Sequence, residues 1–438
     1  MCFSSRAMLD ARTLSERREE IAESCRKRRV QADLDGAIAA QEQLTRLTTQ
    51  LNDLNQARNA HQKSGKKKLE PGEREALVAE GRRLKEEVAA LEDELRAARE
   101  VLNEKLDPLP NYIHPAVPEG GEEDFNILST WGEPPKPDFE LRDHLAICAD
   151  LDLVDFERAS EVAGQKWYYL KNEAVLLELA LQRFALDRAM AAGFAPYTTP
   201  DVARTEVVHA MGFNPRGEET NIYSLEQDDL CLVGTAEIPL GGLLLDQIVD
   251  EDQLPMRVAG ISHCFRVEAG AYGRESRGLY RVHQFTKTEM FVFCTPEQSD
   301  EVHEELLAIE EGIFRDLEVP YRVIDVASGD LGAPAYRKFD IEAWMPGRGE
   351  GGSYGEITSA SNCTDYQARR LRARFRRKPE DGQKKGRVDF VHTLNGTAVS
   401  NARTIMLLIE SHQQADGSIA IPKALQPYVG RELIGPRA

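Results

Sequence analysis

Apolar residues recur three and four positions apart along two stretches near the start of the chain. In the first stretch they are Leu44, Leu47, Leu51 and Leu54, and in the second they are Leu84, Val88, Leu91, Leu95, Ala98 and Leu102. These spacings mark the a and d positions of helices whose apolar stripe is too narrow to cover a globular core. A break that contains Gly and Pro, KSGKKKLEPGE, separates the two stretches. The pattern predicts an antiparallel two-helix coiled coil over about residues 37–102, with helices of roughly 30 residues that are ~45 Å long.

The predicted turn between these helices is basic. The residues from 58 to 68 include no Asp or Glu, and their cations are Arg58, Lys63, Lys66, Lys67 and Lys68. A solvated turn has this composition, and so does a tip that contacts the phosphates of a helical nucleic acid by charge and shape. The sequence leaves both interpretations open at this point.

A segment rich in Pro and Gly, LDPLPNYIHPAVPEGGEEDFN, follows the two helices and is typical of a linker. From about Trp131 onward, strand-like and helix-like segments alternate. We therefore expect an N-terminal domain over residues 1–112, a linker that leads into the core over 113–145, and one large mixed catalytic domain over 146–438.

Composition narrows the class of protein. The 438 residues are 41% hydrophobic and 29% charged, as in a folded, soluble protein of two or three domains. A net charge of −19 argues against nucleic-acid binding driven by bulk charge, although it allows a local basic site. The seven Cys form no CxxC pair, and we see neither a signal peptide nor an apolar stretch that could cross a membrane. We expect a cytoplasmic protein.

The stretch FRVEAGAYGRESRGLYRVHQFTKTEMF, residues 265–291, predicts a β-hairpin with one charged face. A period of two places Arg266 with Glu268 in the first run. In the second run it groups Arg281, His283, Phe285, Lys287 and Glu289. Arg is suited to binding phosphate, and an aromatic ring offers a surface on which a purine can stack. A solvated surface hairpin shows the same alternation, so the period alone does not decide between a surface and a site.

The stretch LNGTAVSNARTIMLLIE, residues 394–410, predicts a buried helix with Arg403 in its first turn. A cation there opposes the helix dipole by a few tenths to about 1 kcal/mol. A bound phosphate would remove this conflict, and a nearby carboxylate would serve equally well.

Two further stretches carry oxygen ligands. In GEITSASNCTDYQARR, Glu356 and Ser359 are of the kind that Mg²⁺ takes when it also holds substrate phosphates. They have opposite parity, so a bulge or a strand end must bring them together. In LVGTAEIPL, Thr235 and Glu237 would share a strand face and could accept hydrogen bonds from an ammonium group, although a strand-end cap is the plainer interpretation.

Taken together, these segments resemble seryl-tRNA synthetases of the bacterial type almost from end to end. FRVEAG…GLYRVHQFTKTEM resembles motif 2 of the class II synthetases, LNGTAVSNART resembles motif 3, and the unit from Lys171 to FAPYTTPDV, with Pro200, resembles motif 1. The class I signatures HIGH and KMSKS are missing from the sequence. The resemblance implies an α+β fold: an antiparallel coiled-coil arm, and a class II catalytic domain with an antiparallel β-sheet flanked by helices. It also implies a homodimer with motif 1 at the interface.

The resemblance implies activation of L-serine with ATP and transfer of serine to tRNA-Ser, and it is compatible with charging of tRNA-Sec as well. Arg266 would hold the α-phosphate and the serine carboxylate, and Arg403 would contact adenine and the γ-phosphate. The implied ATP site is completed by Val267, Glu268, Arg281, Val282, Phe285, Glu356 and Ser359, of which Glu356 and Ser359 would hold Mg²⁺. The implied serine site comprises Thr235, Ala236, Glu237, Arg266, Glu289 and Thr397. The implied catalytic residues are Arg266, Glu356 and Arg403, and the arm would grip the long variable arm of tRNA-Ser.

The chain departs from the family pattern in a few places. The usual LNGSGLAVGR is GTAVSNAR here, with Ala402 where Gly usually precedes the Arg, and Thr358 stands where Ser is usual. The family's usual MLD start corresponds to Met8, which leaves Met1 and Met8 as alternative initiators. A relative that only binds or regulates, and a ligase that loads a carrier protein, are competing interpretations. Retention of the ATP-clamping residues argues against the first, and the complete arm argues against the second.

Overall fold

The computed structural model describes residues 9–64, 71–214, 221–268, 278–349, 351–379 and 382–436. The chain forms two compact units, Met1–Tyr112 and Ile113–Ala438. The first unit contains a short 3₁₀ turn, Ala11–Thr13, and the helices α1 (Arg18–Lys27), α2 (Leu34–Ser64) and α3 (Pro71–Leu106).

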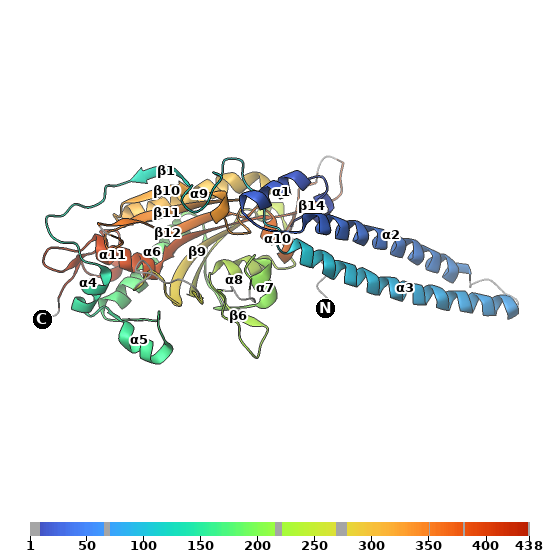
Figure 1. Cartoon of the computed structure of the whole chain (residues 1–438), viewed down its shortest axis with the longest axis horizontal. Coiled ribbons are helices and arrows are strands. Elements are labelled where there is room, and N and C mark those ends of the chain that lie inside the picture. The colour runs from blue at the N-terminus through green and yellow to red at the C-terminus, as the bar shows by residue number, and fades with distance from the viewer. Residues whose placement is uncertain are drawn as a thin grey trace. The chain divides into compact units, whose positions relative to one another are not determined.

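Helices α2 and α3 form the predicted antiparallel coiled coil (Figure 1). Their seam contains Leu44, Leu47 and Leu51 of α2 and Leu91, Leu95 and Ala98 of α3. At the base, the Lys105 ammonium contacts the Asp33 carboxylate at 2.6 Å, and Asp33 caps α2 by accepting from the Gly36 N–H at 2.9 Å. The basic tip is described only in part: Arg58 and Lys63 lie near the end of α2, whereas Lys66, Lys67 and Lys68 fall outside the described residues.

The second unit is built on an eight-stranded sheet. Its strands, in spatial order, are β1 (Asn126–Trp131), β10 (Tyr321–Asp325), β11 (Arg337–Met345), β12 (Ser353–Asn362), β15 (His392–Ser400), β9 (Gln284–Cys294), β8 (Met256–Phe265) and β4 (Ala195–Thr198). Neighbouring strands are antiparallel except β4 and β8, which are parallel. The predicted antiparallel sheet is confirmed. Strand β1 shows that part of the segment 113–145 belongs to this sheet.

Three long helices cover the sheet: α6 (Glu173–Ala191), α9 (Ser299–Asp316) and α11 (Asn401–Ser411) (Figure 1). Helix α6 contacts both α9 and α11, so the three helices form one layer. The core between this layer and the sheet includes Leu181, Phe184, Met290, Phe314 and Ile405, all almost inaccessible to solvent. The remaining helices are α4 (His144–Leu151), α5 (Phe156–Ala163), α7 (Thr205–Ala210), α8 (Glu237–Gly241), α10 (Tyr366–Leu371) and α12 (Gln426–Val429). None of the helices in the described part of the chain is long and apolar enough to span a membrane.

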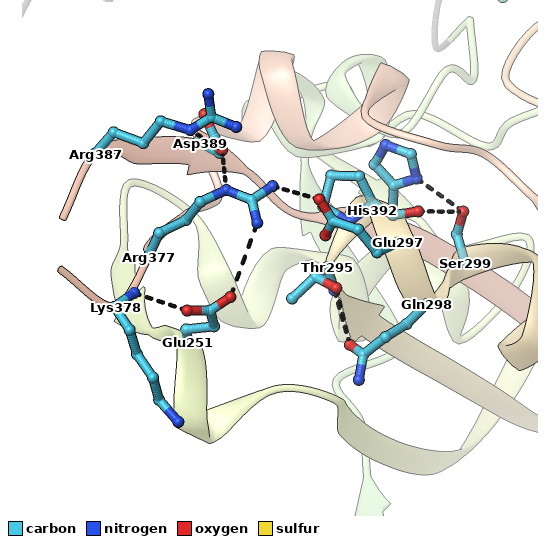
Figure 2. Close-up of polar contacts among 11 residues, drawn as sticks. Glu251, Thr295, Glu297, Gln298, Ser299, Arg377, Lys378, Arg387, Asp389 and His392 are labelled. Atoms are coloured by element: carbon cyan, nitrogen blue, oxygen red, sulfur yellow. Dashed lines mark hydrogen bonds and ion pairs between the residues drawn. The ribbon is translucent and has the colours of Figure 1, made fainter. Parts of the chain in front are cut away.

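A three-stranded sheet packs beside the main one, in the order β14 (Val388–Phe390), β13 (Arg374–Arg376) and β7 (Ile248–Asp250). Figure 2 shows how Arg377, directly after β13, connects this sheet to its surroundings. Its guanidinium contacts Asp389, Glu297 at 2.8 Å and Glu251 at 3.8 Å. The described part of the chain also has three two-stranded ribbons: β2 (Val154–Asp155) with β3 (Tyr169–Leu170), β5 (Val202–Arg204) with β6 (Leu230–Leu232), and β16 (Ile419–Ala420) with β17 (Leu433–Ile434).

Candidate active site

Strand β9 presents three side chains to one side of the main sheet. Phe285, Lys287 and Glu289 alternate along the strand, and all three line cavities on that side. The paired partner β8 fixes their register, with Phe285 opposite Cys264. The predicted shared face is therefore confirmed for these three residues.

In the segments beyond the two strands, the predicted face is confirmed for Arg266, Glu268 and Arg281, which line the cavities, and it was wrong for His283. Strand β8 ends at Phe265 and β9 begins at Gln284. The Arg266 N–H still donates across to the His283 carbonyl at 2.9 Å, but the His283 N–H donates instead to the Lys166 carbonyl at 3.1 Å, so the ladder ends there. Glu268 has a left-handed backbone with φ of 50°, which turns the chain away from the strand direction.

The residues of these two segments therefore have different surroundings. Arg266, Glu268, Arg281 and Val282 still line the cavities. His283 instead bonds the Arg266 carbonyl at 2.8 Å and is not among the described cavity-lining residues. Val267, which donates its N–H to the Asn221 carbonyl at 3.0 Å, is likewise not in the described lining.

The first cavity, which we call the arginine cavity, lies among β9, β12 and the start of α11. Its lining includes Arg266, Tyr280, Phe285, Glu356 and Arg403. The Arg266 guanidinium carbon lies 5.2 Å from the centroid of the Phe285 ring.

A β-bulge in β12 brings the two predicted oxygen ligands to the same cavity. Thr358 pairs with Ile341 and Glu356 pairs with Glu342, which leaves Ile357 as the extra residue. The bulge shifts the parity, so Glu356 and Ser359 both line the arginine cavity. The irregularity that the sequence required is confirmed.

Arg403 lies in the first turn of α11, as predicted, and pairs with Glu356. Its Nη1 lies 3.3 Å from Glu356 Oε2 and donates to the Glu356 carbonyl at 2.9 Å. Burial alone would raise the pKa of Glu356, but the charges of Arg403, Lys338 and Arg266 outweigh it and lower the pKa to about 2. The site thus holds an ionised carboxylate beside two arginines.

Tyr280 is a site residue that the sequence analysis missed. Its ring centroid lies 4.6 Å from the Arg403 guanidinium carbon, and its carbonyl accepts from Arg403 Nε at 3.4 Å. Tyr280 lies before β9, outside the alternating residues, so the strand period gave no signal for it.

The second cavity, which we call the carboxylate cavity, is lined by Thr235, Glu237, Glu289 and Asn395, among others. The prediction that Thr235 and Glu237 share a strand face was wrong. Glu237 begins helix α8, and Thr235 Oγ1 accepts from its N–H at 3.2 Å. Pro239 is compatible with this helix because a first-turn N–H has no partner within the helix.

The carboxylates of this cavity are buried and hydrogen-bonded. Glu237 Oε1 accepts from Gln367 at 2.6 Å and from Asn395 at 3.1 Å. Burial and the charge of Glu289 raise the pKa of Glu237 to about 7. Glu289 pairs with the Lys287 ammonium and accepts from Thr397 Oγ1 at 3.1 Å.

Three other residues near the site are Ala236, Lys338 and Asp340. Ala236 is fully buried in an apolar cluster and is not among the described residues of either lining. Lys338, which the sequence analysis did not single out, lines the carboxylate cavity and pairs with Asp340 at 3.0 Å. Burial raises the pKa of Asp340 to about 7, and Lys338 opposes this effect.

The two cavities meet. Arg266, Glu268, Lys287 and Ser359 line both of them. One side offers arginines and aromatic rings, which suit a polyanion with a flat ring, and the other offers buried carboxylates, which suit an ammonium group. The arrangement can hold two such ligands with their reacting groups together at Arg266.

Comparison with known proteins gives the family of this chain. The family model "Seryl-tRNA synthetase N-terminal domain" matches residues 8–113, and "tRNA synthetase class II core domain (G, H, P, S and T)" matches residues 222–412. Serine–tRNA ligases of Treponema denticola and Rubrobacter xylanophilus are each 51% identical to this chain over 98% of it, and the matches cover 100% and 99% of those proteins. The chain belongs to the seryl-tRNA synthetase family. The family that the sequence motifs indicated is therefore confirmed.

Solved structures of the same family have the same fold. The seryl-tRNA synthetase from Pyrococcus horikoshii complexed with ATP has a TM-score of 0.86 and 36% identity, with 98% of this chain and 100% of that chain covered. The cytoplasmic serine–tRNA ligase from Naegleria fowleri in complex with AMP has a TM-score of 0.83 and 31% identity, with 98% of this chain and 99% of that chain covered.

Proposed function

We propose that the protein activates L-serine with ATP to form seryl-adenylate and pyrophosphate, and then transfers serine to tRNA-Ser with release of AMP. The observation that carries this proposal, beside family membership, is the place of Arg266. It lines both cavities, next to Phe285 on one side and Thr235 and Glu237 on the other. An ATP α-phosphate and a serine carboxylate that both bind Arg266 would be neighbours.

The first step needs alignment and charge neutralisation rather than a base. The serine carboxylate is already a nucleophile, so it can attack the α-phosphate without losing a proton. The bond from the α-phosphate to pyrophosphate breaks as the new bond forms, and negative charge crowds around the phosphorus. Arg266 and Arg403 supply fixed positive charge there, and Phe285 and the guanidinium of Arg403 enclose adenine. Glu268 and Val282, which line the arginine cavity, and Arg281, which pairs with Glu268 at 3.2 Å, complete the proposed nucleotide contacts.

Mg²⁺ would be held by Glu356 and Ser359. The two donors face one cavity, and the charges of Arg403, Lys338 and Arg266 lower the pKa of Glu356 and keep it ionised. The described residues contain no cluster of three or more His, Cys, Asp or Glu that could hold a metal alone. The donor set therefore fits an ion that takes most of its ligands from water and phosphates, and such an ion supplies further charge neutralisation.

The carboxylate cavity suits the amino and hydroxyl groups of serine. Glu237 and Thr235 would accept from the ammonium, and Ala236 would pack behind them in the apolar cluster. Glu289 would bond the hydroxyl together with Thr397, which lines the arginine cavity and donates its hydroxyl to Glu289, in one hydrogen-bonded group with Lys287. A buried group of this kind is left unpaired by alanine, which lacks the hydroxyl.

The coiled coil and the surface of α6 suit the remaining partners. The α2–α3 hairpin, with Arg58 and Lys63 and the sequence positions Lys66, Lys67 and Lys68, would bind the long variable arm of tRNA-Ser, and tRNA-Sec would be bound in the same way. Val175, Leu176 and Leu179 of α6 and Tyr197 of β4 are apolar and exposed, which supports a homodimer through motif 1. We expect the enzyme to act in the cytoplasm.

The T397V variant tests the serine site. Loss of the Thr397 hydroxyl removes the donor that Glu289 accepts from, so kcat/KM for serine should fall about tenfold. The rate with alanine should change little, so the preference for serine over alanine should narrow. Amino-acid-dependent ATP–pyrophosphate exchange measures both effects.

A matched control is T404V. Thr404 is fully buried, and its hydroxyl has no hydrogen-bond partner among the described residues. We expect exchange rates like those of the unmodified chain. If T397V leaves the serine preference unchanged, or T404V changes it equally, Thr397 has no role in recognising the hydroxyl.

A further inference from the structure

Glu410 lies near the C-terminal end of α11, two turns after Arg403, and is almost completely buried. Three N–H donors surround its carboxylate. Oε1 lies 2.7 Å from His144 Nδ1 and accepts from the His144 backbone N–H at 3.0 Å, and Oε2 accepts from the Gly347 N–H at 2.9 Å. The carboxylate thus joins α4 and the turn after β11 to the end of α11.

His144 extends this connection to the segment that leads into β9. The Leu279 backbone N–H donates to His144 Nε2 at 3.3 Å. Because an N–H needs a lone pair to bond, Nε2 carries no proton, and the ring proton lies on Nδ1, facing Glu410. Both ring nitrogens of this buried histidine are therefore used, one as donor and one as acceptor.

Glycines allow the backbone to approach both side chains. Gly278 has a φ of +64°, and a Cβ there would lie 1.9 Å from His144 Nε2. A Cβ at Gly347 would lie 2.5 Å from Glu410 Oε1. The two backbone segments are therefore fixed directly against the His144–Glu410 pair.

These segments carry the side chains that hold Arg403. Tyr280 follows Leu279, and Arg348 follows Gly347. The Tyr280 ring centroid lies 4.6 Å from the Arg403 guanidinium carbon and 5.2 Å from that of Arg348, and Tyr280 Oη accepts from Arg348 Nη1 at 3.3 Å. Leu279, Tyr280 and Arg403 all line the arginine cavity.

We infer that His144 and Glu410 are positioning residues for the nucleotide half of the site. They hold Leu279 and Gly347 in place, so that Tyr280, supported by Arg348, fixes the plane of the Arg403 guanidinium for ATP. This inference rests on the proposed function. It assigns a role in ATP binding to two buried residues that do not touch the substrate.

Two substitutions at His144 separate its two hydrogen bonds. In H144N the side-chain NH₂ replaces Nδ1–H and keeps the bond to Glu410, but nothing accepts from Leu279. In H144Q the side-chain oxygen replaces Nε2 and accepts from Leu279. We expect H144N to raise the KM for ATP roughly tenfold and to change the KM for serine less than about twofold. We expect the KM for ATP of H144Q to stay within about threefold of that of the unmodified chain. Serine-dependent ATP–pyrophosphate exchange gives both constants.

H412N is the matched control. His412, which caps the same helix, bonds the Leu317 carbonyl through Nε2 at 2.9 Å. The substitution should lower the Tm and leave the KM for ATP unchanged. If H144N does not fold, E410Q takes its place as the test. The NH₂ group that this substitution introduces cannot accept from the Gly347 N–H, so E410Q should also raise the KM for ATP roughly tenfold.

The outcomes separate this inference from the function on which it rests. If the unmodified chain shows no serine-dependent exchange, the proposed function fails. If it is active and H144N keeps a normal KM for ATP, or if H144Q or H412N raises that KM as much as H144N does, the positioning role is wrong. Where E410Q stands in for H144N, a normal KM for ATP overturns the inference.

Discussion

We expect the R403M variant to lose most serine-dependent ATP–pyrophosphate exchange, with kcat/KM about 100- to 1000-fold below that of the unmodified chain. Methionine preserves much of the side-chain length but removes the charge and the planar donor group that face the nucleotide. It also removes the strongest of the charges that lower the pKa of Glu356, so the carboxylate proposed for Mg²⁺ becomes easier to protonate. Both effects act on the same step.

R337M is the matched control for R403M. Arg337 resembles Arg403 in its surroundings: each side chain is 19% exposed and each pairs with a carboxylate, that of Asp325 at 2.7 Å in the case of Arg337. Arg337 also lies over an aromatic ring, with its guanidinium carbon 4.6 Å from the Phe339 centroid. R337M should cost stability without a comparable loss of exchange. Exchange by R403M within tenfold of the unmodified rate would contradict the role of Arg403.

Deletion of residues 40–95 should abolish charging of tRNA-Ser while exchange stays within about threefold of the full chain. The deletion removes most of α2 and α3 and joins Ala39 to Arg96 through a short Gly/Ser linker. Ala37, Leu102 and Leu106, which are buried at the base of the hairpin, are kept. Exchange should persist because each of the described residues that line the two cavities belongs to the second unit.

A charge variant tests how much the basic tip contributes to tRNA binding when the shape of the arm is kept. Replacing Arg58, Lys63, Lys66, Lys67 and Lys68 with Ser keeps the hairpin and removes its local cations. We expect weaker tRNA binding with a smaller dependence on salt, and unchanged exchange. Normal charging by the deletion variant would show that the arm does not bind the tRNA.

The sequence was most informative where a pattern extends over many residues. The coiled coil follows from a seam repeated over several turns, and the bulge in β12 follows from two oxygen ligands of opposite parity, Glu356 and Ser359. Alternation served well along β9, where the ladder with β8 continues. It was wrong for His283, whose N–H leaves the ladder for the Lys166 carbonyl and whose ring bonds the Arg266 carbonyl.

Sequence periodicity could not predict the structure of short segments or the contacts between residues far apart in the chain. TAEIPL is too short to distinguish a strand from the first turn of α8, so Thr235 and Glu237 were placed on a strand face. Tyr280 lies in an irregular segment, and its contact with Arg403 depends on the fold of the whole domain. The hydrogen bonds between His144 and Glu410 join positions 266 residues apart, which no local periodicity can indicate.

The most direct test of the proposed function is amino-acid-dependent ATP–pyrophosphate exchange with serine, alanine, glycine and threonine as alternative substrates. We predict exchange with serine and an efficiency with alanine on the order of 10⁴-fold lower, because alanine leaves the hydrogen-bonding groups around Glu289 and Thr397 unpaired. No exchange with serine, or equal exchange with serine and alanine, would contradict the assignment of the two cavities to ATP and serine.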